Sequence, residues 1–228
     1  MFADGRGGCT SRFSRARSRH TNPARAAGLE GGRRASEPMT LSDTKQQLRA
    51  TVRARRRAAH ASGAGAAAAA LVEVFERSVT LSPDAVVAGY WPAGSELDVR
   101  PLLARLHARS HRLVLPMVIE RAAPLVFRVW RPGDPVVERN RVGGPADGAP
   151  PLDPDVLLVP LLGFDRSGAR LGQGAGHYDR TLPVLRAAKP IRAIGVGYAV
   201  QELPSVPTGP YDQKLDAVLT EAGLIEIG

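Results

Sequence analysis

The stretch that most constrains the fold joins an apolar run to a glycine-rich segment, between residues 156 and 180. Residues 156–162 are continuously apolar and are bounded by Pro154 and Gly163, as expected of a strand buried on both faces of an α/β sheet. The glycines that follow permit positive φ angles, so that consecutive backbone N–H groups can converge on an anion. They are Gly168, Gly172, Gly174 and Gly176. We therefore expect a phosphate-binding loop at the end of a central strand.

Charged side chains around these glycines point to a phosphate accompanied by a metal ion. Arg170 and Arg180 offer planar donor forks that match phosphate oxygens. Asp179 would repel a polyanion unless a divalent cation such as Mg²⁺ bridged the two. The spacing GxGxG matches neither the dinucleotide nor the P-loop motif, and glycine-rich turns are commonly structural. The glycines alone therefore do not show whether this loop binds a ligand.

The whole string is more specific than its glycines, and it resembles the signature of 5-formyltetrahydrofolate cyclo-ligases, also called methenyltetrahydrofolate synthetases. The matching residues are Val159-Pro160, Gly163-Phe164-Asp165, Gly168, Arg170-Leu171-Gly172, Gly174, Gly176 and Tyr178-Asp179-Arg180. The resemblance spans about residues 40–227. It implies ATP- and Mg²⁺-dependent closure of 5-formyltetrahydrofolate to 5,10-methenyltetrahydrofolate, with release of ADP and phosphate through a phosphorylated formyl group.

The resemblance also implies roles for residues of this string. Arg170 and Tyr178 are assigned to the catalytic group. The ATP-binding set from this stretch comprises Arg170, Leu171, Gly172, Gln173, Gly174, Ala175, Gly176, His177 and Tyr178. Many family members have two tyrosines where this chain has His177-Tyr178, so His177 either donates to phosphate or only packs.

A helix is predicted from Ser42, as its N-cap, to about residue 59. Cations recur along it at intervals of four, namely Lys45, Arg49, Arg53 and Arg57. A solvated face is the alternative, and we keep that interpretation for Arg53 and Arg57. The resembled family carries a Lys-x-x-x-Arg helix that contacts ATP, which Lys45 and Arg49 match.

A second set of residues follows a predicted strand at residues 84–90. Trp91 offers a flat apolar surface and Glu96 an acceptor for the amino groups of a pterin ring. From composition alone, core packing of Trp91 and helix capping by Glu96 are equally open. The family pattern Tyr-x-Pro-x-x-x-Glu-x-Asp is matched by Tyr90, Pro92, Glu96 and Asp98. It implies that Trp91 and Glu96 bind the folate substrate.

A second metal ligand is implied near the C-terminus. Tyr211-Asp212 and Asp216 fit a short family pattern in which an Asp joins Asp179 in holding magnesium, and we assign that role to Asp216. Asp216 could instead cap the end of a strand. His107 and His111 have a spacing that can bind metal, but with no third ligand in view we expect surface histidines.

The remaining pattern alternates helices with strands and predicts a single α/β domain with a largely parallel sheet, flanked by helices on both faces. Pro183 is expected to interrupt the helix that follows the glycine loop. The Pro/Gly-rich residues 132–154 are either a functional lid or a mobile excursion. Further helices are predicted at residues 62–78 and 99–110, and further strands at 112–118, 125–130, 191–198 and 215–220.

Most of the basic excess lies at the N-terminus. Residues 1–38 hold eight Arg against Asp4, Glu30 and Glu37, which accounts for +5 of the formal net charge of +9. This segment lacks apolar periodicity, so we expect a disordered basic extension before a cyclo-ligase domain at residues 39–228. A transit peptide, a nucleic-acid-binding arm and translation from upstream of the true start at Met39 are the alternatives. We favour the last, because Asp4, Glu30 and Glu37 do not suit a transit peptide.

Location and competing functions follow from composition. Cys9 is the sole cysteine, so no internal disulfide can form. We expect a cytoplasmic monomer that binds ATP and folate, with no membrane contact and no nucleic-acid partner. The runner-up function is a nucleic-acid-binding protein that uses its basic arm without ATP turnover. A nicotinamide dehydrogenase ranks lowest, because the strand predicted at residues 191–198 carries no ribose-binding acid.

Overall fold

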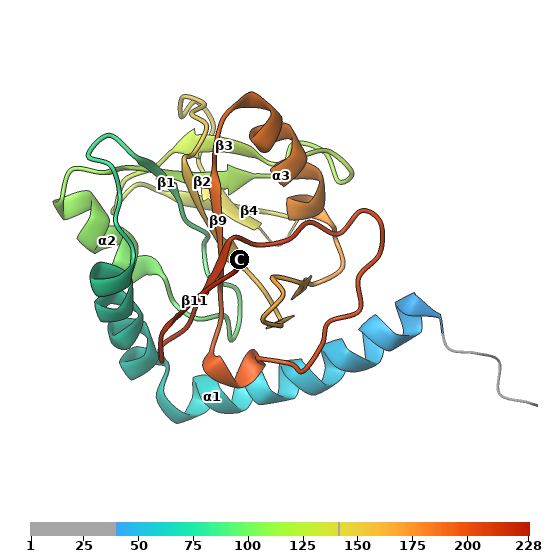
Figure 1. The fold of residues 1–228 in the computed structure, drawn as a ribbon. Coiled ribbons are helices and arrows are strands. Elements are labelled where there is room, and N and C mark those ends of the chain that lie inside the picture. The colour runs from blue at the N-terminus through green and yellow to red at the C-terminus, as the bar shows by residue number, and fades with distance from the viewer. Residues whose placement is uncertain (1–39, 141) are drawn as a thin grey trace, which may run out of the picture. The chain divides into compact units, whose positions relative to one another are not determined.

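The computed structural model describes residues 40–140 and 142–228, so every expectation about the basic extension lies outside the described residues. A main sheet lies at the centre of the described part. Its strands are β1 (Val86–Ala88), β2 (Arg112–Met117), β3 (Val126–Val129), β6 (Val156–Pro160), β9 (Arg192–Val196), β10 (Ala217–Leu219) and β11 (Leu224–Glu226). Their spatial order is β11-β10-β9-β6-β1-β2-β3 (Figure 1). Neighbouring strands from β10 to β2 pair in parallel, and only β11 and β3 at the edges pair antiparallel, which confirms the largely parallel sheet.

Helices cover both faces of this sheet, as predicted. They are α1 (Leu41–Ser78), α2 (Arg100–Ala108) and α3 (His177–Ala188). Phe75 of α1 and Leu103 of α2 belong to the core on one face, whereas Leu182 of α3 belongs to the core on the other. In β6, Leu158 points into the first core and Leu157 into the second, so the central strand is buried on both sides.

Helix α1 unites two predicted helices and starts earlier than expected. The two halves meet at a bend at Gly63, whose φ of 173° and ψ of 46° are not helical (Figure 1). Thr40 is the N-cap, because its hydroxyl accepts from the Asp43 N–H and the Asp43 carboxylate accepts from the Thr40 N–H. The prediction of Ser42 as N-cap is wrong. The residue three positions beyond Ser42 is Lys45, whose side chain has no acceptor and cannot receive a hydrogen bond from the Ser42 N–H.

The first half of α1 packs against a small hairpin rather than against the main sheet. This hairpin consists of β7 (Gly163–Phe164) and β8 (Arg170–Leu171). Val52 of α1 is fully buried in a separate cluster with Leu162, Leu171 and Leu203. This packing holds the basic face of α1 next to the glycine-rich loop that follows β8.

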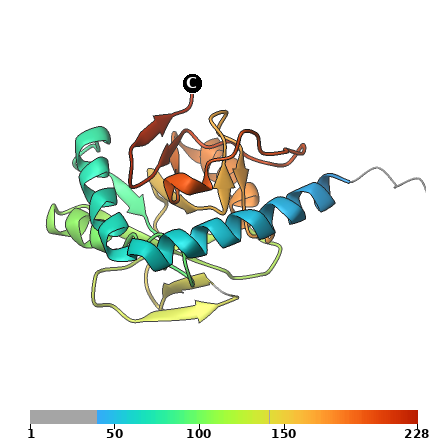
Figure 2. The same ribbon diagram turned by 90° about the horizontal axis from the view of Figure 1, so that it is seen from below.

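The Pro/Gly-rich connection contains a hairpin of its own, β4 (Val136–Arg139) and β5 (Val142–Pro145), which lies at the lower edge of Figure 2 in yellow. Gly143 forms a bridge with Trp91, and a Cβ on Gly143 would lie 2.6 Å from the Trp91 Cβ. A Cβ on Gly144 would lie 2.3 Å from the Pro116 carbonyl oxygen. Glycine is therefore required where this hairpin approaches β2 and Trp91.

Helix α3 runs through Pro183, so the predicted interruption is wrong. Pro183 lies on the exposed side, whereas Leu182 and Leu185 are buried on the other. Burial of that apolar face outweighs the single hydrogen bond that proline cannot make.

One helix in the described part of the chain, α1, is long and apolar enough to cross a membrane by length and composition alone. An 18-residue window of it has a mean hydropathy of 1.3. Because Leu71, Val74 and Phe75 in the same helix pack into the core, α1 is not a clear membrane span.

Candidate active site

A cavity of about 640 Å³ lies at the carboxyl ends of the central strands. Tyr90, which follows β1, and Pro160, which ends β6, both line it. From β1 the chain crosses to β2 on one side of the sheet, and from β6 it crosses to β9 on the other. The cavity therefore lies where the strand order reverses, the place where open α/β sheets bind ligands. Its volume suits a small-molecule site.

Almost all of the predicted site residues meet at this cavity, although they come from three distant parts of the sequence. Those that line it are Lys45, Arg49, Trp91, Glu96, Arg170, Leu171, Gly172, Gln173, Gly174, Ala175, Gly176, His177, Tyr178 and Asp179. Only Asp216 among the assigned residues lies elsewhere.

The glycine-rich loop forms one wall and leads into α3. Gly174 and Gly176 have φ angles of 107° and 68°, which residues other than glycine rarely adopt. Gly176 is the N-cap of α3, and no side chain caps this helix. The first N–H groups of a helix have no partner within it and carry partial positive charge. The loop and the start of α3 thus present the donors that a phosphate requires.

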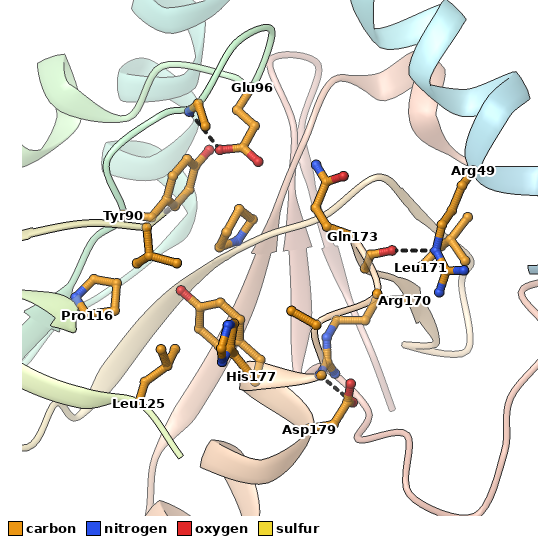
Figure 3. Close-up of a pocket in the computed structure, with 18 of the residues that line it drawn as sticks. Arg49, Tyr90, Glu96, Pro116, Leu125, Arg170, Leu171, Gln173, His177 and Asp179 are labelled. Carbon is orange, nitrogen blue, oxygen red and sulfur yellow. Dashed lines mark hydrogen bonds and ion pairs between the residues drawn. The ribbon is translucent and has the colours of Figure 1, made fainter. Parts of the chain in front are cut away.

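Three arginines fix this loop. Arg49 donates from Nε to the Gly172 carbonyl at 3.0 Å, a contact drawn in Figure 3. Arg53 donates to the Gln173 side chain at 3.1 Å and lines the cavity, so the prediction that Arg53 is merely solvated is wrong. Arg180 donates to the Ala175 carbonyl at 2.8 Å and is not among the lining residues. Its guanidinium holds the loop instead of facing a ligand.

Arg170 and Asp179 form a partly buried pair beneath the loop (Figure 3). Arg170, only 8% exposed, donates from Nη2 to Asp179 at 2.6 Å and from Nη1 to the Gln213 carbonyl. Burial lowers the pKa of Arg170, and the charges of Asp179 and Asp212 oppose that shift. Because Arg170 already balances the charge of Asp179, this carboxylate does not by itself require a metal ion.

Asp216 is not among the residues that line the cavity. Arg186 donates to both of its carboxylate oxygens at 3.0 Å, and the Ala193 N–H donates to it at 2.6 Å. Its carboxylate thus binds α3 and the start of β9, in line with the structural alternative.

Asp212 lines the cavity instead. Its carboxylate accepts from the Lys45 ammonium and from the Gly209 N–H. Burial works against its charge, but the bonds from Lys45 and Gly209 hold the pKa of Asp212 below its ordinary value. The sequence signal was available, since Asp212 stands in the same family pattern four residues before Asp216.

The carboxylates at the cavity determine whether a magnesium ion fits there. No group of three or more His, Cys, Asp or Glu side chains among the described residues could hold a metal. Asp179 and Asp212 both lie close enough to act on Arg170 electrostatically, which places two carboxylates on the same side of the cavity. Mg²⁺ is commonly bound by one or two carboxylates together with phosphate oxygens and water. These residues therefore fit Mg²⁺ that arrives with a phosphate ligand.

The other end of the cavity is mainly apolar and carries the carboxylate of Glu96. Glu96, Tyr90, Pro116 and Leu125 lie on the opposite side of the view from Arg49 (Figure 3). The Glu96 carboxylate accepts from the Ala93 N–H at 3.0 Å, which turns the chain after β1.

Trp91 also lines this end but is packed rather than free. The Trp130 ring meets it edge-on with 5.9 Å between centroids, and the Arg100 guanidinium lies 5.2 Å from its centroid. Much of the Trp91 surface is therefore already used, which leaves less of it to stack on a ligand.

His177 lies between the two ends (Figure 3), and Tyr178, the next residue in the chain, also lines the cavity. Burial, together with the nearby charge of Glu96, raises the pKa of Tyr178 far above its ordinary value. Its phenol is therefore neutral and can donate a hydrogen bond. Burial and the charge of Arg180 lower the pKa of His177, so this imidazole is neutral at pH 7.

Sequence reasoning missed Asn140 and Val142, which line the cavity from the β4–β5 hairpin. Their short, glycine-flanked strands give no periodic signal. It also missed Arg56, which pairs with Glu96 from α1. A buried helix position next to Val52 could have revealed this residue, but three consecutive arginines hid it.

The comparisons with known proteins agree on one family. The model of the 5-formyltetrahydrofolate cyclo-ligase family matches residues 41–221. A 5-formyltetrahydrofolate cyclo-ligase of Mycolicibacterium smegmatis is 39% identical over 142 residues, which cover 59% of this chain and 72% of the relative. A protein of the same name from Escherichia coli K12 is 33% identical over 146 residues, covering 61% of this chain and 80% of the relative.

Two solved structures share the fold, each at 23% identity. A 5,10-methenyltetrahydrofolate synthetase from Mycoplasma pneumoniae has a TM-score of 0.63 and covers 78% of this chain and 98% of that one. The one from Aquifex aeolicus has a TM-score of 0.65 and covers 80% and 92%. Both structural likenesses establish the α/β architecture. The family model and the sequence relatives establish the family. The chain therefore belongs to the 5-formyltetrahydrofolate cyclo-ligase family.

Proposed function

We propose that this ligase closes 5-formyltetrahydrofolate to 5,10-methenyltetrahydrofolate at the expense of ATP, releasing ADP and phosphate. One observation carries the proposal. A single cavity joins a cationic, glycine-lined end to an apolar end with one carboxylate, so a nucleotide and a folate can meet in it.

The cationic end suits the phosphates of ATP. Lys45 and Arg49 line this end from α1, and residues 172–177 of the glycine-rich loop line it next to Arg49, which contacts Gly172. Lys45 now pairs with Asp212, and this contact can exchange for a phosphate oxygen when the nucleotide arrives. Asp179 and Asp212 would hold Mg²⁺, which supplies positive charge to the transferring phosphoryl group.

The apolar end suits the pterin ring. Pro116, Leu125 and Val142 offer apolar contact, and Glu96 accepts hydrogen bonds from ring N–H groups. A carboxylate has only acceptors, so it selects a ligand edge that carries donors. Trp91, packed against Trp130, also lines the cavity and supports this wall.

The chemistry needs no side-chain nucleophile. The formyl oxygen attacks the γ-phosphorus, the bond to the ADP oxygen breaks, and an N5-iminophosphate forms. The folate N10 amine then adds to the activated carbon and loses its proton, and phosphate leaves with the former formyl oxygen. Backbone donors of the loop and the neutral Tyr178 phenol stabilise charge on the transferring oxygens.

The test is to mix the protein with 5-formyltetrahydrofolate, ATP and MgCl₂ and to follow the methenyl chromophore and ADP together. We expect both to appear in equal amounts and the reaction to stop when ATP or Mg²⁺ is omitted. Folded protein that makes no chromophore, or that makes it without consuming ATP, refutes the proposal.

A further inference from the structure

Arg56 is a buried cation that the proposed chemistry does not use. It lies one turn after Val52 on the inner face of α1 and is 7% exposed. Its neighbours in the helix, Arg55 and Arg57, are exposed. A buried guanidinium costs much free energy unless a partner compensates its charge. The position of Arg56 therefore needs an explanation that a solvated arginine stripe does not supply.

The partner of Arg56 is the loop that carries Glu96. Arg56 donates from Nε to the Ser95 hydroxyl at 3.1 Å. Its Nη1 lies 3.5 Å from Oε1 of Glu96 and makes no hydrogen bond to any described residue. The pair is well shielded, since the Arg56 and Glu96 side chains are 9% and 11% exposed. Burial lowers the pKa of Arg56, and the Glu96 charge acts against that shift.

The carboxylate of Glu96 is consequently held from two sides. Oε2 accepts from the Ala93 N–H at 3.0 Å, and Oε1 faces Arg56. The loop itself is tied down by the Tyr90 hydroxyl, which donates to the Leu97 carbonyl at 2.6 Å. Glu96 lines the cavity and Arg56 does not, so the guanidinium stands behind the carboxylate.

We propose that Arg56 is a positioning residue that sets the specificity of the folate end, by holding Glu96 as an oriented carboxylate for the paired N–H donors of an aminopyrimidine ring. This inference rests on the proposed contact between Glu96 and folate. Arg56 balances the negative charge of Glu96 inside a low-dielectric wall, and it limits the directions in which the carboxylate can point. The unused N–H of Nη1 can follow the carboxylate when a ligand draws it forward.

Two consequences distinguish this role from a structural one. The ring donors are bound equally before and during phosphoryl transfer, so loss of Arg56 should change the KM for folate and leave kcat and the KM for ATP unchanged. Discrimination against a folate that lacks the 2-amino group should also fall, because a site built for N–H donors rejects an analogue without them.

The experiment is a double-mutant cycle with Arg56→Met, Glu96→Gln and the double variant, in the full chain. We expect each single change to raise the KM for 5-formyltetrahydrofolate by about tenfold or more, the scale of one charge-assisted hydrogen bond. The double variant should be no worse than the poorer single variant. Preference for 5-formyltetrahydrofolate over its 2-desamino analogue should fall in all three, and Arg56→Lys, which keeps the charge, should recover part of it.

The matched control is Arg57→Met, which removes a cation from the same helix at an exposed position outside the cavity. It should change neither KM nor the preference. If Arg56→Met does not fold, the comparison of Glu96→Gln with the double variant, which leaves no unpaired buried charge, carries the test. Equal KM values for folate are then expected, and a further rise in the double variant overturns the inference.

A structural role of Arg56 and a wrong folate contact give different results in these experiments. If Glu96→Gln raises the KM for folate and Arg56→Met only lowers the melting temperature, Arg56 is structural and this inference is wrong. If Glu96→Gln leaves the KM and the analogue preference unchanged, the proposed folate contact itself is wrong, and the inference falls with it.

Discussion

Arg170 reaches Asp179 with one nitrogen and the carbonyl oxygen of Gln213 with the other. The Gln213 N–H in turn donates to Asp179 at 3.0 Å. These bonds fasten the segment before β10 to the first turn of α3, so that Asp212 faces the cavity. Direct contact of Arg170 with phosphate stays a prediction. In the structure, Arg170 holds the Asp179 carboxylate directly and fixes the segment that carries Asp212.

The three aspartates near this point should respond differently to removal of charge. Asp179→Asn and Asp212→Asn each remove a hard anionic oxygen from the phosphate side of the cavity, so the Mg²⁺ concentration for half-maximal rate should rise about tenfold or more. Asp216→Asn, the matched control, removes the ion pair with Arg186 and leaves one acceptor oxygen for the donors of Arg186 and Ala193, so it should lower only the melting temperature. The measurement is a Mg²⁺ titration of the rate, with the melting temperature of each variant. A Mg²⁺ requirement that shifts in Asp216→Asn alone would restore the original assignment of Asp216.

Lys45 and Arg49 should affect the binding of ATP more than its turnover. Lys45→Ala removes a cation from the cavity, and Arg49→Ala removes both a cation and the bond to Gly172. Both should raise the KM for ATP severalfold with a smaller change in kcat, because the contacts exist before and during transfer. Initial rates at varied ATP give the answer. An unchanged KM in both variants removes α1 from the nucleotide site.

At the scale of elements, α3 carries an avoidable defect. Pro183 has no N–H for the Asp179 carbonyl, yet the helix passes through it. Pro183→Ala should restore that bond and stabilise the protein by about 1 kcal/mol, which raises the melting temperature by about 2–4 °C. The KM values should not change, because Pro183 lies outside the cavity. A lower melting temperature in this variant would show that the rigid ring contributes more than the missing bond.

The elements that the sequence predicts well are those buried on both faces or periodic in their burial. The run at residues 156–162 is β6 with little adjustment, because no other element accommodates so many apolar residues in sequence. The β4–β5 hairpin and β11 escaped prediction. Their few residues are half exposed or glycine, and only contacts with β2, Trp91 and β10 give them order.

The site divides in the same way. The glycine-rich string is contiguous, so its residues arrive together at the cavity once β6 is placed. The position of Asp212 depends on which way its loop turns, and the burial of Arg56 depends on which face of α1 packs inward. Neither property can be read from the residues that neighbour it in the sequence. Asp216 looks equivalent to Asp212 in sequence but lies outside the cavity, and Arg57 looks equivalent to Arg56 but is exposed.

At the scale of the whole molecule, residues in the described part of the chain build three core clusters, and residues 1–38 lack apolar periodicity in the sequence. A chain that begins at Met39 should therefore fold and turn over like the full chain. Its melting temperature and its kcat/KM for both substrates provide the comparison. Loss of soluble protein on this truncation would mean that residues 1–38 take part in folding.

The central claim is that the formyl oxygen of the folate is phosphorylated in the cavity before the ring closes. The most direct measurement uses 5-formyltetrahydrofolate with ¹⁸O in the formyl group, with Mg²⁺ and unlabelled ATP, in ordinary water. Mass analysis of the released phosphate should find one ¹⁸O atom per methenyl product, because the bond from that oxygen to phosphorus survives closure. Unlabelled phosphate, with the ¹⁸O recovered in water, would mean that ATP is hydrolysed separately from ring closure and would contradict the account.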